Sequence, residues 1–122
     1  MDFGVLALVG RVLIGGAFVF SGVRMLMNLP LVSGLLAAKR VPFPQVVATA
    51  GGIFEVVMGL AAISGVWFPA VAVALAVFIV AATLMVHDFW NEEGAQRFTD
   101  VNAVISNVII VGALLALAGL SA

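Results

Sequence analysis

Glu55 is the residue whose chemistry the rest of the sequence has to explain. It lies near the middle of residues 48–63, a stretch that is otherwise almost entirely apolar. An ionisable side chain at such a depth in a membrane costs at least ~2.5–3.5 kcal/mol, so it requires a partner or a function. Ala48, Gly52 and Gly59 share one helical face with Glu55. Small residues on that face would let a neighbouring helix approach the carboxylate closely.

The expected partner of Glu55 is Arg11, on the first apolar segment. At 1.5 Å per residue, antiparallel threading puts Glu55 ~15 Å and Arg11 ~20 Å from the side that carries the first and third loops. Three interpretations of this pair stay open. It is a structural ion pair that fixes the first helix against the second, or it edges a cavity and orients a polar head group, or Glu55 moves a proton.

A second set of polar residues is expected at the loop side of the bundle. His87 and Asp88 end the third apolar segment, and Arg24 and Asn107 are expected near the same level. Together they could bind a quinone carbonyl, a lipid head group or a proton. The alternative is an ordinary interfacial helix end anchored by Trp90, with Asn107 bonding between helices. No metal site is expected, because one histidine and one aspartate lack a third convincing ligand.

The composition places these residues in a membrane protein. Of 122 residues, 65% are hydrophobic and 9% charged, whereas about 25% of residues are charged in soluble domains. The apolar residues form four segments, each near the ~20 residues that cross ~30 Å of hydrocarbon: about 4–26, 45–65, 68–88 and 101–120. The sequence therefore predicts an all-α fold, a single domain over 1–122 built as an integral membrane four-helix antiparallel bundle in the lipid bilayer.

Charge and cysteine content exclude several classes of function. A net charge of −1 argues against nucleic acid as a partner, because no basic face is available to neutralise phosphates. The chain has no cysteine, which excludes disulfides, thiol exchange through its own residues and cysteine-ligated clusters. Its single histidine excludes bis-histidine haem ligation within one chain.

The loops predict the orientation and the ends of the helices. Lysine and arginine gather on the first and third loops and their flanks, which favours a cytoplasmic position for both loops and an external position for both termini: Arg24, Lys39, Arg40 and Arg97. The piece before Lys39 could form a short interfacial helix. Thr99 or Asp100 is expected to cap the last helix. The small residues Gly112 and Ala116 could serve association with a second copy.

Several motifs, in the right order along nearly the whole chain, resemble the DoxX family. They are GRVLIG at 10–15, FSGVR at 20–24, Glu55 with Gly59, HDFW at 87–90, and Asn107 with Gly112. The resemblance implies a small four-helix protein of the bacterial cytoplasmic (inner) membrane. Position 24 holds Arg where the family leads us to expect Lys, which keeps the charge and alters its geometry.

The resemblance also implies redox work. A related subunit occurs in a quinone-reducing thiosulfate oxidoreductase, another relative assists disulfide formation, and a mycobacterial member is associated with a membrane oxidoreductase complex. Many members have no assigned activity, so the resemblance leaves open whether this chain is an enzyme and which cofactor, a quinone among them, it uses.

Two hypotheses follow for the function. The first is a redox-associated subunit that binds a quinone or other lipophilic small molecule within the bundle, beside a redox partner protein. Its polar contacts would come from Arg11, Glu55 and Asn107, with His87 and Asp88 nearer the aqueous mouth. The alternative is a non-catalytic membrane scaffold or assembly partner, in which the Arg11–Glu55 pair is structural.

Overall fold

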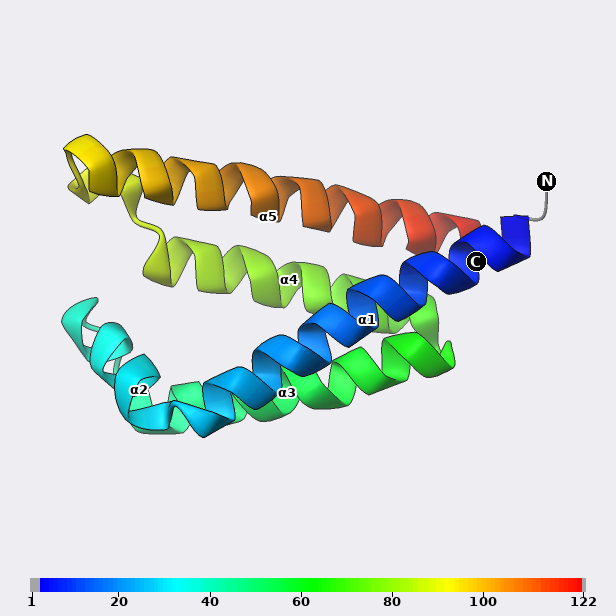
Figure 1. Ribbon diagram of the computed structural model, residues 1–122, viewed down its shortest axis with the longest axis horizontal. Helices are drawn as coiled ribbons and strands as arrows, with labels where there is room; N and C mark the ends of the chain where they lie inside the picture. Colours follow the sequence, from blue (N-terminus) through cyan, green and yellow to red (C-terminus); the bar gives the residue numbers. More distant parts are fainter. Residues whose placement is uncertain (1–2, 122) are drawn as a thin grey trace.

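Four long helices run alternately in opposite directions along one axis (Figure 1). The computed structural model describes residues 3–121, and their elements follow in chain order: α1 (Phe3–Met27), α2 (Leu29–Ala38), α3 (Pro44–Ser64), α4 (Phe68–Val86), the short 3-10 helix η1 (Phe89–Asn91) and α5 (Gly94–Ser121). Four helices are long and apolar enough to cross a membrane. The prediction of an all-α, integral membrane four-helix antiparallel bundle is confirmed.

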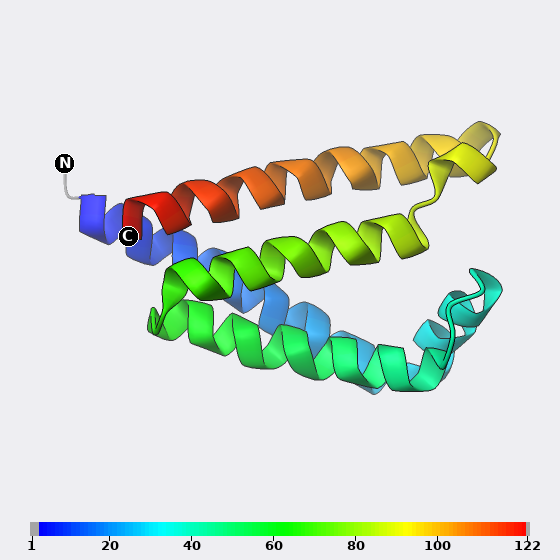
Figure 2. The same cartoon turned by 180° about the vertical axis from the view of Figure 1, so that it is seen from behind.

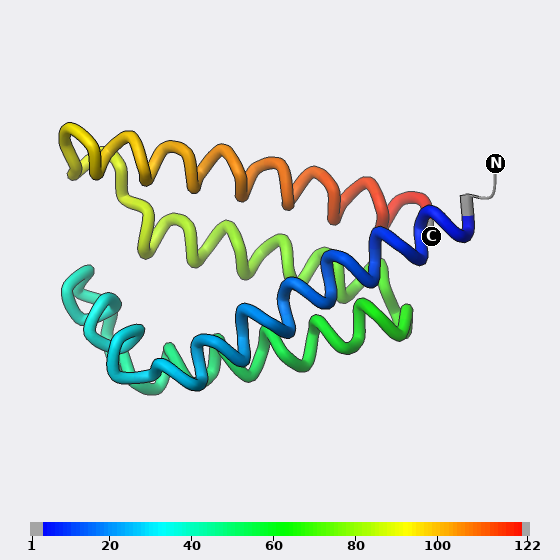
Figure 3. The backbone as a smooth tube through the Cα atoms, in the orientation of Figure 1, coloured from blue at the N-terminus to red at the C-terminus, as the bar shows by residue number. Residues whose placement is uncertain are grey.

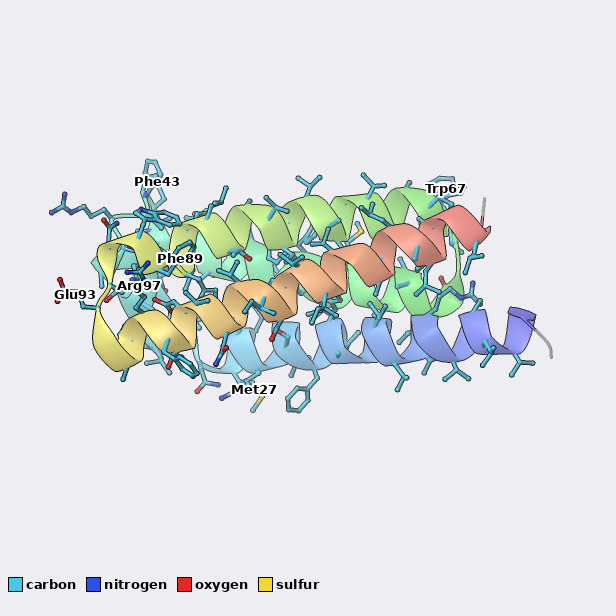
Figure 4. All side chains as sticks on the ribbon, turned by 90° about the horizontal axis from the view of Figure 1, so that it is seen from above. Met27, Phe43, Trp67, Phe89, Glu93 and Arg97 are labelled. Atoms are coloured by element: carbon cyan, nitrogen blue, oxygen red, sulfur yellow. The ribbon has the colours of Figure 1, made fainter. Side chains whose placement is uncertain are left out.

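The length of α3 and the aromatic residues beside it match a bilayer. Its 21 residues span about 31 Å at 1.5 Å per residue, which is close to the thickness of the hydrocarbon core. Phe43 precedes the helix and Trp67 follows it, and their side chains are 78% and 82% exposed. The two rings point outward at opposite ends of the bundle (Figure 4), as aromatic residues do at the two membrane interfaces.

The helices pack as two pairs, α1 with α3 and α4 with α5. Glycines bring α1 and α3 together: a Cβ on Gly15 would lie 2.5 Å from the carbonyl oxygen of Gly59, and one on Gly22 would lie 2.6 Å from that of Gly52. No side chain fits at these two crossings, so the backbones approach as closely as small residues allow. Ala48, Gly52, Glu55 and Gly59 are all buried, which confirms the predicted face of α3.

The larger of the two apolar core clusters joins the two pairs at one end of the bundle. Phe68, Leu75 and Leu114 are fully buried there, next to the turn that links α3 to α4. Towards the opposite end, which carries α2 and η1, the pairs diverge (Figures 1 and 2). We call this the loop end. There α2 lies over the beginning of α3 and buries Leu36 against Ala48.

Both termini of the described chain lie at the other end, where α1 and α5 extend beyond the α3–α4 turn (Figure 3). The glycine contacts give the register of the two helices, since Gly15 lies opposite Gly59 and Gly22 lies opposite Gly52. In this register the last residue of α3, Ser64, lies opposite Gly10, whereas α1 begins at Phe3. The beginning of α1 and the end of α3 are therefore not level with each other.

Two helix ends differ from the sequence-based expectation. The last helix begins at Gly94 rather than near 101, so Thr99 and Asp100 lie inside α5 and do not cap it. Hydrophobicity could not reveal these first turns because they are polar, and side-chain bonds support them, such as Gln96 Nε2 to Asp100. Helix α4 ends at Val86, which leaves His87 and Asp88 in the bend that follows.

Candidate functional site

The divergence of the two helix pairs leaves a cavity of about 500 Å³ in the loop half of the bundle. All four long helices contribute to its wall, and most of the wall is apolar: Leu13, Ile14, Ala17, Phe18, Ser21, Glu55, Phe78, Ile79, Ala82, His87, Asn107 and Ile110. A second hollow of about 330 Å³ shares Glu55, Phe78, Ala82, His87 and Asn107 with it and continues towards α2. Cavities of this size and character bind small molecules. We refer to the two together as the central cavity.

Glu55 reaches the central cavity from α3 and is held by α1. The Ser21 hydroxyl donates to Glu55 Oε2 over 3.0 Å, and the Glu55 side chain is 7% exposed. In the sequence, Ser21 is part of the FSGVR motif at 20–24, and nothing there indicated a role for its hydroxyl. The register of the glycine contacts explains the bond, because it brings the segment around Ser21 opposite the segment just before Glu55.

The expected Arg11–Glu55 pair is not formed. In the α1–α3 register, Arg11 lies opposite position 63, eight residues from Glu55, which is about 12 Å along the axis. The guanidinium lies against Gly65 at the end of α3 and 6.0 Å from the centre of the Phe68 ring. A cation at this place is favoured by the negative end of the α3 dipole. The expectation was wrong because it measured depth from helix ends that are not level.

His87 and Asn107 do line the central cavity, as expected, and each has a neighbour that the sequence did not indicate as a site residue. His87 Nδ1 lies 3.2 Å from Oδ1 of Asp100, a carboxylate that is 4% exposed. Asn107 Nδ2 donates to the Thr83 hydroxyl over 2.8 Å, across the α4–α5 interface. The spacing of Asp100 and Asn107, seven residues on one helix, is the signal that could have placed both at one face.

Asp88 does not line the central cavity and belongs to an ion-pair cluster with Lys39 and Glu92. Lys39 Nζ lies 2.5 Å from Asp88 Oδ1 and 2.9 Å from Glu92 Oε1. Hydrogen bonds to Asp88 and then Glu92 raise the pKa of Lys39 well above its usual value. The two bonds from Lys39, which follows α2, join the half of the bundle that contains α1, α2 and α3 to the half that contains α4 and α5.

Arg24 does not line the central cavity itself. It lines an adjoining hollow of about 280 Å³, which shares Ser21 with the first part of the cavity and Met25 and Val32 with the second. The amide of Asn28 donates to the Arg24 carbonyl. Of the six predicted binding residues, the structure thus brings Glu55, His87 and Asn107 to one cavity, and it places the other three elsewhere: Arg11, Arg24 and Asp88.

Three carboxylates near the loop end have the spacing of a metal site. Oxygens of Asp88, Glu92 and Asp100 lie within 4.8 Å of one another. The Lys39 ammonium already neutralises the first two, and His87 engages the third. A divalent cation would have to displace Lys39, so we assign no metal to this cluster.

Comparison with known proteins identifies the family to which this chain belongs. The DoxX family model matches residues 6–88, which is more than half of the 122 residues and includes Ser21, Glu55 and His87. No curated protein and no solved structure matches the chain. The matched range also contains the motifs at 10–15 and 20–24 and the pair Glu55 with Gly59. The chain belongs to the DoxX family.

Proposed function

We propose that this DoxX-family protein binds a quinone or another lipophilic small molecule in the central cavity, as a redox-associated subunit of a bacterial inner membrane. The observation that carries the proposal is a cavity of about 500 Å³ in which Ser21, Glu55, His87 and Asn107 interrupt an apolar wall. Lipophilic ligands with a polar head need this combination of apolar surface and a few placed polar groups.

The aromatic residues and the opening of the cavity support the same ligand class. Phe18 and Phe78 line the cavity, and Phe78 stacks on Phe54 with ring centres 4.9 Å apart. Such rings suit a planar head group. On α1, Leu13 lines the cavity and is 68% exposed on the outer surface. A ligand dissolved in the bilayer would therefore enter the cavity laterally, past α1, without passing through water.

A redox role requires a partner. The chain has no cysteine, so electrons would come from another protein, and the polar loop end is the side on which we expect it to bind. Lys39 and Arg40 follow α2 directly, and Arg97 lies in the first turn of α5, all at or near that end. This favours a cytoplasmic position for it and an external position for both termini. A second copy of the chain is a further proposed partner.

The alternative function, a non-catalytic scaffold, depended on a structural Arg11–Glu55 pair. That pair is not formed, and Glu55 instead faces a cavity. A buried carboxylate that only fixed helix register would be expected to have its cation beside it. We therefore propose the ligand-binding function in preference to the scaffold.

Mass spectrometry of the mildly solubilised protein tests the proposal. The expected result is a stoichiometric isoprenoid quinone or similar lipophile, which is reduced in amount by Glu55→Gln and by His87→Ala. Thr49→Ala is the matched control, because Thr49 is on the same helix as Glu55 and its exposed hydroxyl bonds only within the helix. Bulk lipid alone, or equal ligand in all variants, would contradict the proposal.

A further inference from the structure

Three side chains of the central cavity offer hydrogen-bond acceptors that no described residue uses. The first of them is Asn107. The Thr83 hydroxyl donates to the carbonyl oxygen of Ile79 over 2.6 Å, so its oxygen has to accept the bond from Asn107 Nδ2. This fixes the orientation of the amide. Its carbonyl oxygen, Oδ1, then has no donor among the described residues.

His87 also presents a free acceptor to the cavity. An ionised carboxylate accepts hydrogen bonds and cannot donate them, so the bond from His87 Nδ1 to Asp100 puts a proton on Nδ1. The other ring nitrogen of the neutral imidazole, Nε2, then carries a lone pair. Asp100 is 4% exposed and also faces the amide of Gln96 at 3.4 Å, which holds it in place.

Glu55 supplies the third acceptor of the cavity. Its Oε2 accepts the Ser21 hydroxyl, and Oε1 has no donor among the described residues. None of the basic side chains of the described residues forms an ion pair with Glu55: Arg11 lies at the end of α3, Lys39 pairs with Asp88 and Glu92, and Arg24 lines the adjoining hollow. The carboxylate therefore offers an acceptor to whatever occupies the cavity.

These three acceptors are accessible. Within residues 3–121, the unpartnered side-chain atoms that are sealed from solvent are Arg11 Nε and Ser33 Oγ. Glu55 Oε1, His87 Nε2 and Asn107 Oδ1 are not among the sealed atoms, and their residues line both parts of the central cavity. A bound molecule can reach them.

We infer that the ligand of the central cavity presents hydroxyl donors, so that the site selects the reduced, hydroquinone form of a quinone over the oxidised form. This inference rests on the proposed function. A quinone carbonyl brought to an acceptor makes no hydrogen bond, and both groups lose their water. A hydroxyl donates to any of the three acceptors, and Phe18 and Phe78 in the same wall offer apolar contacts to the ring.

Binding of three matched probes tests the inference. Decyl-ubiquinone, its hydroquinone and the dimethyl ether of the hydroquinone share one ring and one tail, and only the hydroquinone has O–H donors. Each is titrated anaerobically against the full chain in lipid nanodiscs. We expect the hydroquinone to bind about tenfold tighter than the other two. Asn107→Leu should reduce that preference several-fold, whereas Asn102→Leu, at an exposed position on the same helix, should leave it unchanged.

The outcomes separate this inference from the proposed function. Binding of quinone and hydroquinone with equal affinity would overturn the inference and leave the proposed function standing. Binding of none of the three would overturn the inference and also remove a quinone as the ligand of the proposed function. Tighter binding of decylamine than of the hydroquinone would also overturn the inference, because it would show that the acceptors select a cation. An unchanged preference in Asn107→Leu would remove Asn107 from the set and contradict the geometry described above.

Discussion

The Ser21 hydroxyl lies 3.0 Å from Oε2 of Glu55, and this bond joins α1 to α3 at the wall of the central cavity. Glu55 is 7% exposed and has no basic side chain beside it in the part of the chain that the structure describes. A neutral hydroxyl thus orients a carboxylate for which the sequence predicted an arginine as partner. The arrangement leaves Glu55 free to interact with a ligand.

Replacement of Ser21 by alanine should weaken the fold modestly. The change removes one buried hydrogen bond, and we expect a loss of about 0.5–1.5 kcal/mol in the free energy of unfolding. Reversible unfolding in detergent micelles measures it. Thr49→Ala serves as the control, because the Thr49 hydroxyl bonds to Gln45 of its own helix. Equal stability of Ser21→Ala and the wild type would mean that the bond contributes nothing.

The glycine contacts between α1 and α3 predict a larger effect. In Gly59→Ala the new methyl group would lie 2.6 Å from the carbonyl oxygen of Gly15, so the helices must separate. We expect a loss of about 1–3 kcal/mol. Gly112→Ala is the matched control, since nothing lies within 4 Å of its added methyl group. Because alanine favours helix by up to ~1 kcal/mol over glycine, that variant should be neutral or more stable.

Lys39 is predicted to hold the loop end together. Lys39→Met leaves Asp88 and Glu92 without their cation, and the α4–α5 half should then move away from α2. Amide hydrogen exchange should become faster in α2 and η1 while the α1–α3 interface stays protected. Arg40→Asn is the control, because Arg40 is exposed and asparagine tolerates its positive φ of 62°. Unchanged exchange in α2 would contradict the prediction.

The pH dependence of this cluster has a definite sign. The pKa of Lys39 is raised in the folded protein above its ordinary value of 10.5. Its contribution to stability is therefore fully present below pH 10.5 and decreases as the pH rises through the higher folded pKa. The difference in stability between the wild type and Lys39→Met should accordingly stay constant between about pH 7 and pH 9. A difference that shrinks in this range would exclude Lys39 as its source.

The tautomer of His87 should depend on Asp100. This is the single histidine of the chain, so ¹⁵N spectra of its labelled imidazole need no assignment if the affinity tag contains no histidine. We expect the neutral ring to carry its proton on Nδ1 in the wild type and to lose that preference in Asp100→Asn. Asp88→Asn, which changes a neighbouring carboxylate that bonds Lys39 instead, should keep the wild-type tautomer. Identical spectra for all three proteins would show that Asp100 does not orient the ring.

Local spacing was sufficient to predict part of this arrangement. The repeat of Ala48, Gly52, Glu55 and Gly59 identified the buried face of α3, because helical periodicity alone decides which residues share a face. Four apolar segments of membrane length predicted the bundle. His87 and Asn107 were correctly placed at the same end, because antiparallel helices bring the end of one beside the beginning of the next.

The contacts between helices could not be predicted in the same way. Arg11 was matched to Glu55 by counting from helix ends, but the glycine contacts shift α1 along α3 and leave Arg11 at Gly65. The polar first turns of α5 gave no hydrophobic signal, so Asp100 was interpreted as a cap. Helix α4 ends at Val86, so a helix drawn through 88 could not show that Asp88 pairs with Lys39 while His87 lines the cavity.

Filling the central cavity tests its role in ligand binding most directly. Ala82 on α4 lines both parts of the cavity, whereas Val77 on the same helix is 63% exposed on the outer surface. We would titrate decyl-ubiquinone and its hydroquinone against Ala82→Trp and Val77→Trp in nanodiscs. Ala82→Trp is predicted to abolish saturable binding while Val77→Trp retains the wild-type affinity. Undiminished binding by a folded Ala82→Trp protein would show that the ligand binds elsewhere and would contradict the assignment of this cavity.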